Sequence, residues 1–285
     1  MPGAPMTSLC LWAGTLAGHD LWTRIRAAGR AGFAGLSVAP AELDAVLVVG
    51  DEPRLRAELT RCGVALACLD PVASWLPDPV AAHPAHRVHA AMSAARCLEL
   101  GERFGITLLN AIDVTWRALP HAAGAHLADF AARARRRGIT VAVEAQVSSG
   151  IPNLAAAYEL CLAAGPDVRL TIDTWHFFRD PRNRIADVPP EAVGALQLAD
   201  GPATPGADPV VESTTGRLMP GEGSFALRRL LAATAPHPRC PVGPEVFTTP
   251  VPAARAAEVA LRARDATERT LSGAAVAGQS QTTLG

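Results

Sequence analysis

Four oxygen-bearing side chains lie in or at the end of consecutive apolar segments in the second half of the sequence: Glu144, Asp173, Gln197 and Glu245. The segments read ITVAVE, VRLTID, GALQLAD and CPVGPEV. If they are parallel strands, the four side chains converge at one edge, where a lone buried carboxylate is unfavourable. A divalent cation would offset the repulsion among three carboxylates, and this set suits Mn²⁺ or Mg²⁺, with Co²⁺ and Zn²⁺ as further candidates. We therefore predict one metal site, although polar groups that cap helices or bind loop amides would give the same pattern.

Other polar and aromatic residues near these segments are candidates for substrate contacts. His176 lies three residues after Asp173, where it could orient a substrate or transfer a proton. Arg217 precedes the turn LMPGEGS, and its guanidinium could bind a carboxylate, a hydroxyl or a phosphate, unless it is a solvated loop residue. Trp12 and Trp175 lie at or after strand ends and could wall a small polar ligand, but packing in the core is an equally good interpretation.

The elements that must position these residues are short apolar runs alternating with Ala-rich amphipathic stretches, a pattern typical of parallel βαβ units. The apolar runs lie near residues 8, 36, 66, 109, 141, 170, 196 and 244. Helical periodicity and glycine stop signals predict the helices. They cover residues 21–32, 42–49 (a helix or a turn), 53–62, 83–100, 122–137, 154–164, 225–233 and 252–267. Eight such units predict a single α/β domain, a (β/α)8 TIM barrel with its active site at the carboxyl ends of the strands. A doubly wound sheet is the competitor, but its usual Gly-rich loop after the first strand is missing.

Length and composition limit the alternatives. In a chain of 285 residues, 49% hydrophobic and 19% charged residues exclude a wholly disordered protein. We expect the barrel to span residues 1–268 and residues 269–285 to form a mobile C-terminal tail, since the sequence from Ser272 onward is uncharged and without periodicity. A net charge of −1 gives no basic footprint for nucleic acid. No uncharged apolar run reaches the ~18 residues of a membrane helix, and the first residues lack a secretory signal's basic region, so we expect a cytoplasmic protein.

Cysteine and lysine usage add two observations. None of the six cysteines forms a Cys-x-x-Cys pair, so a zinc ribbon or a thioredoxin-type site is not expected. All 26 basic residues are arginine, which we interpret as coding bias.

These segments also carry a family resemblance. The sequence resembles the xylose isomerase-like TIM-barrel superfamily over roughly residues 7–268, most specifically in VAVEAQ, TIDTWHFFR, LQLADG, GRLMPGEGSF and GPEVF. That superfamily holds sugar (phosphate) isomerases and epimerases, inosose isomerases and dehydratases, 3-dehydroshikimate dehydratases and endonuclease IV. The resemblance places the metal ligands on Glu144, Asp173, Gln197 and Glu245, and the substrate-contacting pair on His176 and Arg217. Many members have a histidine where Gln197 stands, but a glutamine occurs among bacterial 3-dehydroshikimate dehydratases.

We therefore expect an enzyme, a divalent-metal-dependent isomerase or epimerase of a keto-sugar or sugar phosphate. Glu144 and Glu245 would exchange a proton with the substrate carbon next to a metal-bound carbonyl. The alternative is a dehydratase of the 3-dehydroshikimate or inosose type, which would expel a hydroxyl after the same first step. Two other hypotheses are a non-catalytic ligand-binding barrel and an endonuclease IV-like nuclease, whose histidine-rich site the sequence lacks. The resemblance leaves a homodimer or a tetramer open.

Overall fold

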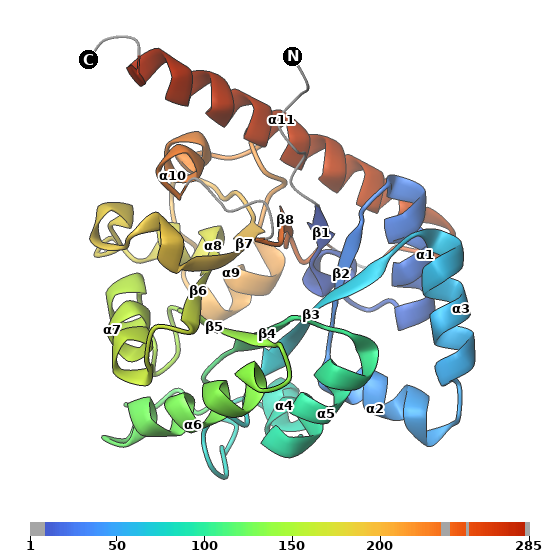
Figure 1. The fold of residues 1–285 in the computed structure, drawn as a ribbon. Coiled ribbons are helices and arrows are strands. Elements are labelled where there is room, and N and C mark those ends of the chain that lie inside the picture. Colours follow the sequence, from blue (N-terminus) through green and yellow to red (C-terminus); the bar gives the residue numbers. More distant parts are fainter. Residues whose placement is uncertain (1–8, 235–239, 249–250, 283–285) are drawn as a thin grey trace.

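Eight short parallel strands form one sheet in sequential order (Figure 1). The computed structural model describes residues 9–234, 240–248 and 251–282, and for residues 275–282 only the backbone. The strands are β1 (Cys10–Leu11), β2 (Gly35–Val38), β3 (Ala65–Val72), β4 (Leu108–Ala111), β5 (Thr140–Glu144), β6 (Val168–Asp173), β7 (Val193–Leu198) and β8 (Val242–Pro244). Leu9 pairs with Val242 in parallel and so joins the first strand to the last. The structure is thus the expected (β/α)8 TIM barrel.

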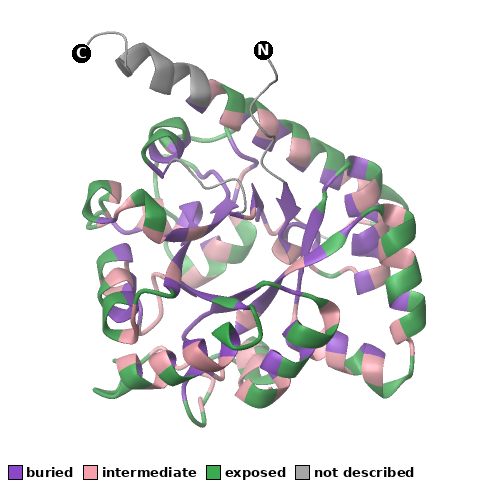
Figure 2. Ribbon diagram, viewed as in Figure 1, coloured by how far each residue is buried: buried purple, intermediate pink, exposed green. Residues whose placement is uncertain are grey.

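Helices surround this sheet and bury their inner faces against it (Figure 2). They are α1 (Leu21–Ala31), α2 (Pro40–Val48), α3 (Glu52–Cys62), α4 (Arg87–Ala90), α5 (Ala94–Phe104), α6 (Ala123–Arg135), α7 (Leu154–Ala164), α8 (Thr174–Arg179), α9 (Pro209–Thr215), α10 (Leu227–Thr234) and α11 (Ala256–Thr282). Local capping fixes several ends, as in α1, where Asp20 accepts a hydrogen bond from Thr23 N at 2.7 Å. Gly32 then ends the helix in the left-handed conformation, with φ of 79°. Among the described helices, none is both long and apolar enough to cross a bilayer.

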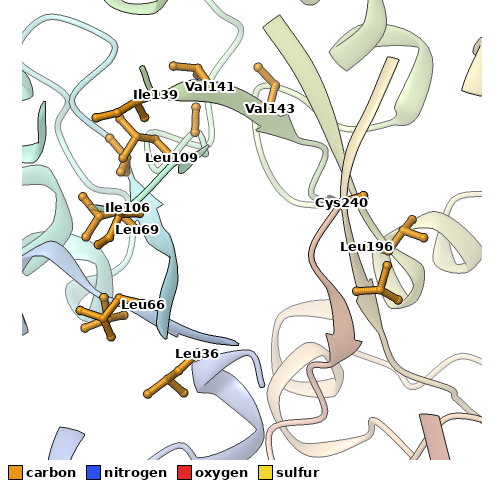
Figure 3. Close-up of a cluster of buried hydrophobic side chains, with 14 of the residues drawn as sticks. Leu36, Leu66, Leu69, Ile106, Leu109, Ile139, Val141, Val143, Leu196 and Cys240 are labelled. Carbon is orange, nitrogen blue, oxygen red and sulfur yellow. The ribbon is translucent and has the colours of Figure 1, made fainter. Parts of the chain in front are cut away.

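Strand alternation divides the buried residues into two sets. Val141 and Val143 belong to the large core between sheet and helices, whose leucines and valines Figure 3 shows, whereas Ala142 packs in a separate cluster. That cluster consists of Cys10, Trp12, Cys68, Leu108, Ala142 and Ala195. Since side chains two residues apart share a strand face, this cluster occupies the inside of the barrel and forms a floor. The next inward positions lie directly above the floor.

The expected helix over residues 83–100 is wrong, because the segment is broken. Residues 84–86 form a single 3-10 turn, α4 follows, and α5 begins only at Ala94. Ser93 caps α5 by accepting a hydrogen bond from Arg96 N at 3.2 Å, and a capping serine holds extended backbone that interrupts a continuous helix. Helical periodicity also did not predict α8 and α9, which are only six and seven residues long.

Both ends of the barrel differ in length from expectation. The first strand is shorter than its apolar run suggests, because β1 contains only Cys10 and Leu11. Thr7 and Ser8 lie outside the described residues. Helix α11 continues to Thr282, so most of the segment expected as a tail is helical. Alanine favours helix, and buried Thr270 and Ala274 keep this segment in contact with the rest of the fold. Residues 283–285 of the expected tail lie outside the described part of the chain.

Candidate metal centre and active site

Six buried polar residues form an acidic cluster directly above the floor of the barrel. They are Asp70, Asn110, Glu144, Asp173, Gln197 and Glu245, from β3 to β7 and the end of β8, and none is more than 9% exposed. Four of them lie two residues beyond a floor residue on the same strand, as Glu144 lies beyond Ala142 and Gln197 beyond Ala195. The period of two along a strand therefore aims these side chains into the barrel. All four predicted metal ligands belong to this cluster.

Glu144 is held by amide donors on both carboxylate oxygens. Asn110 Nδ2 donates to Glu144 Oε2 at 2.5 Å and to Asp70 Oδ1 at 2.8 Å, so it bridges two carboxylates. Gln146 Nε2 donates to Glu144 Oε1 at 2.9 Å. Burial, with the nearby charges of Asp173 and Asp70, nevertheless raises the pKa of Glu144 to about 8.

Asp173 is the carboxylate best stabilised in its charged form. Its Oδ1 accepts hydrogen bonds from Trp175 N at 2.7 Å and His176 N at 3.3 Å, at the first turn of α8. Its Oδ2 lies 2.7 Å from Arg217 Nη1. Burial alone would raise the pKa of Asp173, but Arg217 and the backbone donors outweigh burial and lower it.

Arg217 links this carboxylate to Glu245. Its Nη1 donates to the Glu245 carbonyl oxygen at 3.0 Å and lies 3.9 Å from Glu245 Oε2, while Nε donates to Ser213 O at 2.5 Å. Burial and the charge of Asp70 raise the pKa of Glu245 well above its usual range, and Arg217 opposes this shift. Arg217 is therefore part of the acidic cluster's charge balance.

The tightest candidate metal centre is formed by Glu144, Asp173 and His176, whose potential ligand atoms lie within 4.8 Å of one another. His176 Nε2 lies 3.9 Å from Glu144 Oε1. Burial lowers the pKa of His176 to about 4, so the imidazole is neutral and able to ligate a metal. Two of the predicted ligands, Glu144 and Asp173, are in this group, and His176, predicted to contact substrate, is its third member.

The other two predicted ligands, Gln197 and Glu245, lie outside that three-residue group but in the same cluster. Gln197 Nε2 lies 3.4 Å from Asp70 Oδ2, which leaves Oε1 of Gln197 free to point elsewhere. Among the described residues, Oε1 finds no hydrogen-bond donor although it is buried. Such an orphaned acceptor is unfavourable, and a cation would satisfy it. Four buried carboxylates facing the single guanidinium of Arg217 likewise fit a divalent cation.

A cavity of about 660 Å³ opens above the acidic cluster. Its wall includes Glu144, His176, Gln197, Arg217 and Glu245, so the structure brings these predicted residues to one chamber.

The two predicted tryptophans are absent from the residues that line this cavity. Trp12 is fully buried in the floor, where its Nε1 donates to Leu196 O at 3.1 Å. Trp175 is also fully buried and lies behind Arg217, whose Cζ is 5.4 Å from its ring centroid. Trp12 and Trp175 therefore do not form the wall that the sequence predicted. Among the residues that line the cavity, the large aromatic side chains are those of Trp116 and Phe247.

Sequence reasoning did not single out Asp70 and Asn110. Both carry the signal that identified Glu144, a polar residue at the end of an apolar run, in VALACLD and ITLLNAI. Applying that criterion to the third and fourth strands would have found them.

The closed barrel and the acidic cluster at its carboxyl edge define a (β/α)8 barrel with a candidate metal centre. The model of the family described as xylose isomerase-like TIM barrel matches residues 25–266, and the chain belongs to that family. Comparison with curated protein sequences gave no match.

Solved structures of low sequence identity share the fold. The IOLI protein with a bound zinc atom superposes with a TM-score of 0.74 at 16% identity, covering 93% of this chain and 98% of that one. L-ribulose 3-epimerase gives a TM-score of 0.66 at 14% identity, with coverage of 96% and 97%. The probable 3-DHS dehydratase AsbF from Bacillus anthracis gives 0.69 at 10% identity, with coverage of 90% and 97%. A xylose isomerase-like TIM barrel/4-hydroxyphenylpyruvate dioxygenase fusion protein gives 0.74 at 20%, and the match spans 91% of this chain but only 42% of the fusion protein.

Proposed function

We propose that this chain is a divalent-metal-dependent isomerase or epimerase of a small polyhydroxy carbonyl compound, a keto-sugar or a sugar phosphate. The observation that carries the proposal is the pair of buried carboxylates Glu144 and Glu245 in one cavity, on β5 and directly after β8. Isomerisation and epimerisation both need one group that removes a proton next to a carbonyl and one that returns it. The likeness to an epimerase structure supports the same chemistry.

The metal would be held by Glu144, Asp173, Gln197 and Glu245, with His176 as a further donor within reach of Glu144 and Asp173. Mn²⁺ or Mg²⁺ suits the carboxylate and amide oxygens, whereas the imidazole of His176 also admits Zn²⁺ or Co²⁺. A cation bound there supplies a Lewis acid for the substrate carbonyl.

The remaining chemistry falls to side chains of the chain itself. Burial keeps the pKa of Glu144 and Glu245 above that of a solvated carboxyl, which suits groups that take up and return a proton near neutral pH. Arg217 donates hydrogen bonds to Asp173 and to the backbone carbonyl of Glu245, so it holds the ends of β6 and β8 in position relative to each other.

The first test is the metal content of the purified protein, measured by mass spectrometry in the wild type and in Glu245→Ala. We expect about one divalent ion per wild-type chain and its loss from the variant. Glu159→Ala, which removes an exposed carboxylate from α7, is the matched control and should retain the metal. An absence of metal from the wild type, even after reconstitution with each of the four ions, would exclude the proposal.

The second test follows the proton directly. Incubation of ketoses in D₂O with the metal-loaded protein should place deuterium next to the carbonyl, detected by NMR. Glu144→Gln and Glu245→Gln should each slow this exchange by roughly 10²-fold or more, the usual contribution of a positioned general acid or base. Exchange at the wild-type rate in both variants would assign the proton transfer to other groups.

A dehydratase of the 3-dehydroshikimate or inosose type is the second candidate. Gln197 on β7 and the likeness to the probable 3-DHS dehydratase favour it. The first step would be the same, but the product would be conjugated or aromatic. Its appearance in the ultraviolet spectrum separates the two candidates, because epimerisation adds no chromophore.

A further inference from the structure

Besides residues of the acidic cluster, the cavity is lined by a group that we call the histidine wall: His83, His86, His89 and Trp116. The histidines follow one another at intervals of three residues across the broken helix before α5. His83 stacks on Trp116 with ring centroids 5.8 Å apart, and His86 meets the edge of that ring at 6.2 Å.

Two imidazoles of the histidine wall, those of His86 and His89, are uncharged at neutral pH. Burial and the neighbouring imidazoles lower the pKa of His86, and they lower the pKa of His89 to about 4. His83 Nδ1 accepts a hydrogen bond from Ala85 N at 3.2 Å, which leaves Nε2 as its donor. Neutral imidazoles each offer one donor and one acceptor, a combination that matches hydroxyl groups.

Two aromatic residues of the cavity are held in a backbone conformation that such residues rarely adopt. Trp116 and Phe247 both have φ of 51°, which costs of order 1–3 kcal/mol and occurs mainly at ligand sites. Buried Asp113 fixes Trp116 by accepting from its N–H at 3.0 Å and from Gly150 N at 2.7 Å. Phe247 lies against Gly14, where a Cβ would come within 2.7 Å of its ring. Both rings line the cavity, with His83 stacked on Trp116 and the guanidinium of Arg217 4.9 Å from the ring centroid of Phe247.

The cations on the cavity wall are already paired. Arg24 is 5% exposed and forms an ion pair with Glu42, and Arg217 pairs with Asp173. With Asp173, the carboxylates Glu42, Asp70, Glu144 and Glu245 oppose these two guanidiniums, so the formal charge is −3 and a divalent cation leaves −1. A phosphate or carboxylate is usually recognised by an uncommitted arginine or lysine, and this described wall offers neither.

We infer that the site takes an uncharged polyhydroxy carbonyl compound, whose end remote from the acidic cluster lies against the histidine wall. Its hydroxyl groups would pair with the imidazoles, and its apolar face would lie on Trp116. This inference rests on the proposed function for the carbonyl end alone. It favours free ketoses and inososes as substrates over sugar phosphates, and it disfavours 3-dehydroshikimate, which carries a carboxylate.

Calorimetric titration of the full-length protein, with and without Mn²⁺, tests the charge preference. The probes are D-fructose against D-fructose 6-phosphate, and an inosose against 3-dehydroshikimate. We expect each neutral compound to bind at least about tenfold tighter than its anionic counterpart. Equal or tighter binding of the anions, or no detectable binding of either neutral compound, would overturn the inference. Tight binding of a neutral compound without turnover would refute the proposed function and leave the inference standing.

The variant Glu42→Gln tests whether the pairing of Arg24 causes the preference for uncharged ligands. Glutamine keeps the hydrogen bond that Glu42 Oε2 accepts from Ala39 N at 3.1 Å, so α2 retains its cap, while Arg24 loses its counter-charge. We expect the affinity for D-fructose 6-phosphate to rise relative to that for D-fructose. An unchanged ratio would show that the ion pair has no part in the preference.

The position of the histidine wall is tested with His86→Gln and His89→Leu. Both should weaken D-fructose binding by about fivefold or more but leave the three-carbon ketose dihydroxyacetone unaffected, because a short ligand does not reach the wall. His121→Leu, at an exposed residue outside the cavity, is the control. An equal loss of affinity for both ketoses would show that the histidine wall does not contact the far end of the longer ketose. Circular dichroism of the variants separates that result from misfolding.

Discussion

At the scale of single residues, the acidic cluster depends on amide groups shared between carboxylates. Asn110 stands between Asp70 and Glu144, and its hydrogen bonds lower the pKa of both. Without these two carboxylates, an asparagine inside the barrel would be an isolated buried polar group. Its role is therefore to make two neighbouring carboxylates compatible with burial.

Asn110→Leu should destabilise the protein by roughly 1–3 kcal/mol, because it leaves two buried acceptors without their donor. The loss should be larger at pH 8 than at pH 5, since the ionised carboxylates need the donor most. Urea unfolding at both pH values measures it. A loss that is equal at both would mean that Asn110 acts only through packing.

Stability of the metal-free protein should fall as the pH rises from about 6.5 to 8. Below that range the fall due to Asp70 is opposed by His89 and His176, because burial lowers the pKa of both to about 4 and the unfolded chain then binds protons that the folded state does not. Burial raises the pKa of Asp70 from 3.8 to about 6 and that of Glu144 from 4.5 to about 8. Between the two values of each group, the folded state keeps a proton that the unfolded chain releases, so the free energy of unfolding decreases with pH. For Asp70 alone the decrease is on the order of 2–3 kcal/mol between about pH 4 and pH 6.

Thermal unfolding in the presence of a chelator checks this slope. Glu144→Gln should flatten the fall between pH 6.5 and pH 8, Asp70→Asn should remove the part below pH 6, and Asp129→Asn, at a side chain that is 71% exposed, should do neither. Stability of the wild type that rises between pH 6.5 and pH 8 would contradict the prediction. Addition of Mn²⁺ should reverse the trend, because metal binding favours the ionised carboxylates.

At the scale of elements, α9 forms part of the cavity wall and is anchored by one buried ion pair. Glu212 of α9 pairs with Arg179 of α8, and their side chains are 7% and 5% exposed. Glu212 Oε2 also accepts a hydrogen bond from Gly206 N at 2.9 Å. The position of α9 over the cavity therefore depends on α8, which starts at Asp173.

Glu212→Ala should lower the free energy of unfolding by about 3–5 kcal/mol, since it leaves Arg179 buried and unpaired. It should also raise KM, because α9 lines the cavity, and lower kcat, because Ser213 of α9 accepts a hydrogen bond that helps to hold Arg217. The comparison is Glu258→Ala, which breaks an ion pair whose side chains are both 65% exposed and should change stability by less than about 1 kcal/mol. Equal effects of the two variants in urea unfolding would argue against the anchoring role.

Sequence patterns predicted the elements that follow simple periodicity and missed those set by local exceptions. All eight strands were predictable, because they are apolar runs bounded by turn residues. The break at Ser93 was not, because residues 83–100 satisfy helical spacing on both sides of it. Helix α8 was missed because it is short and Asp173, its N-cap, had been interpreted only as a metal ligand.

The same distinction holds within the site. The convergence of Glu144, Asp173, Gln197 and Glu245 was predicted from strand ends alone, and the structure places all four buried side chains in the acidic cluster. Which aromatic residues face the cavity could not be predicted, because Trp12 and Trp175 are equally compatible with either face of a strand end. That choice is made by long-range contacts such as the one from Trp12 to Leu196.

At the scale of the whole molecule, α11 packs along α1 and α10 and spans one side of the barrel (Figure 1). Buried Thr270 and Ala274 lie beyond residue 268, where the sequence suggested that the barrel ends.

A chain truncated after Glu268 should therefore be less stable than the full chain by about 1–3 kcal/mol, because these contacts are lost. Truncation after Ala274 is the control and should have a smaller effect. Equal stability of both shortened proteins and the full chain, in urea unfolding, would restore the view of residues 269–285 as a tail.

The permanent cations of this barrel are all guanidiniums, including the pair at the cavity wall, Arg24 and Arg217. A ketone or aldehyde in the cavity thus meets no side-chain amine with which it could condense. No side chain can form an imine with the substrate, and the carbonyl must react without a covalent link of that kind to the protein. Borohydride added during turnover should reduce free substrate while leaving the mass of the chain unchanged.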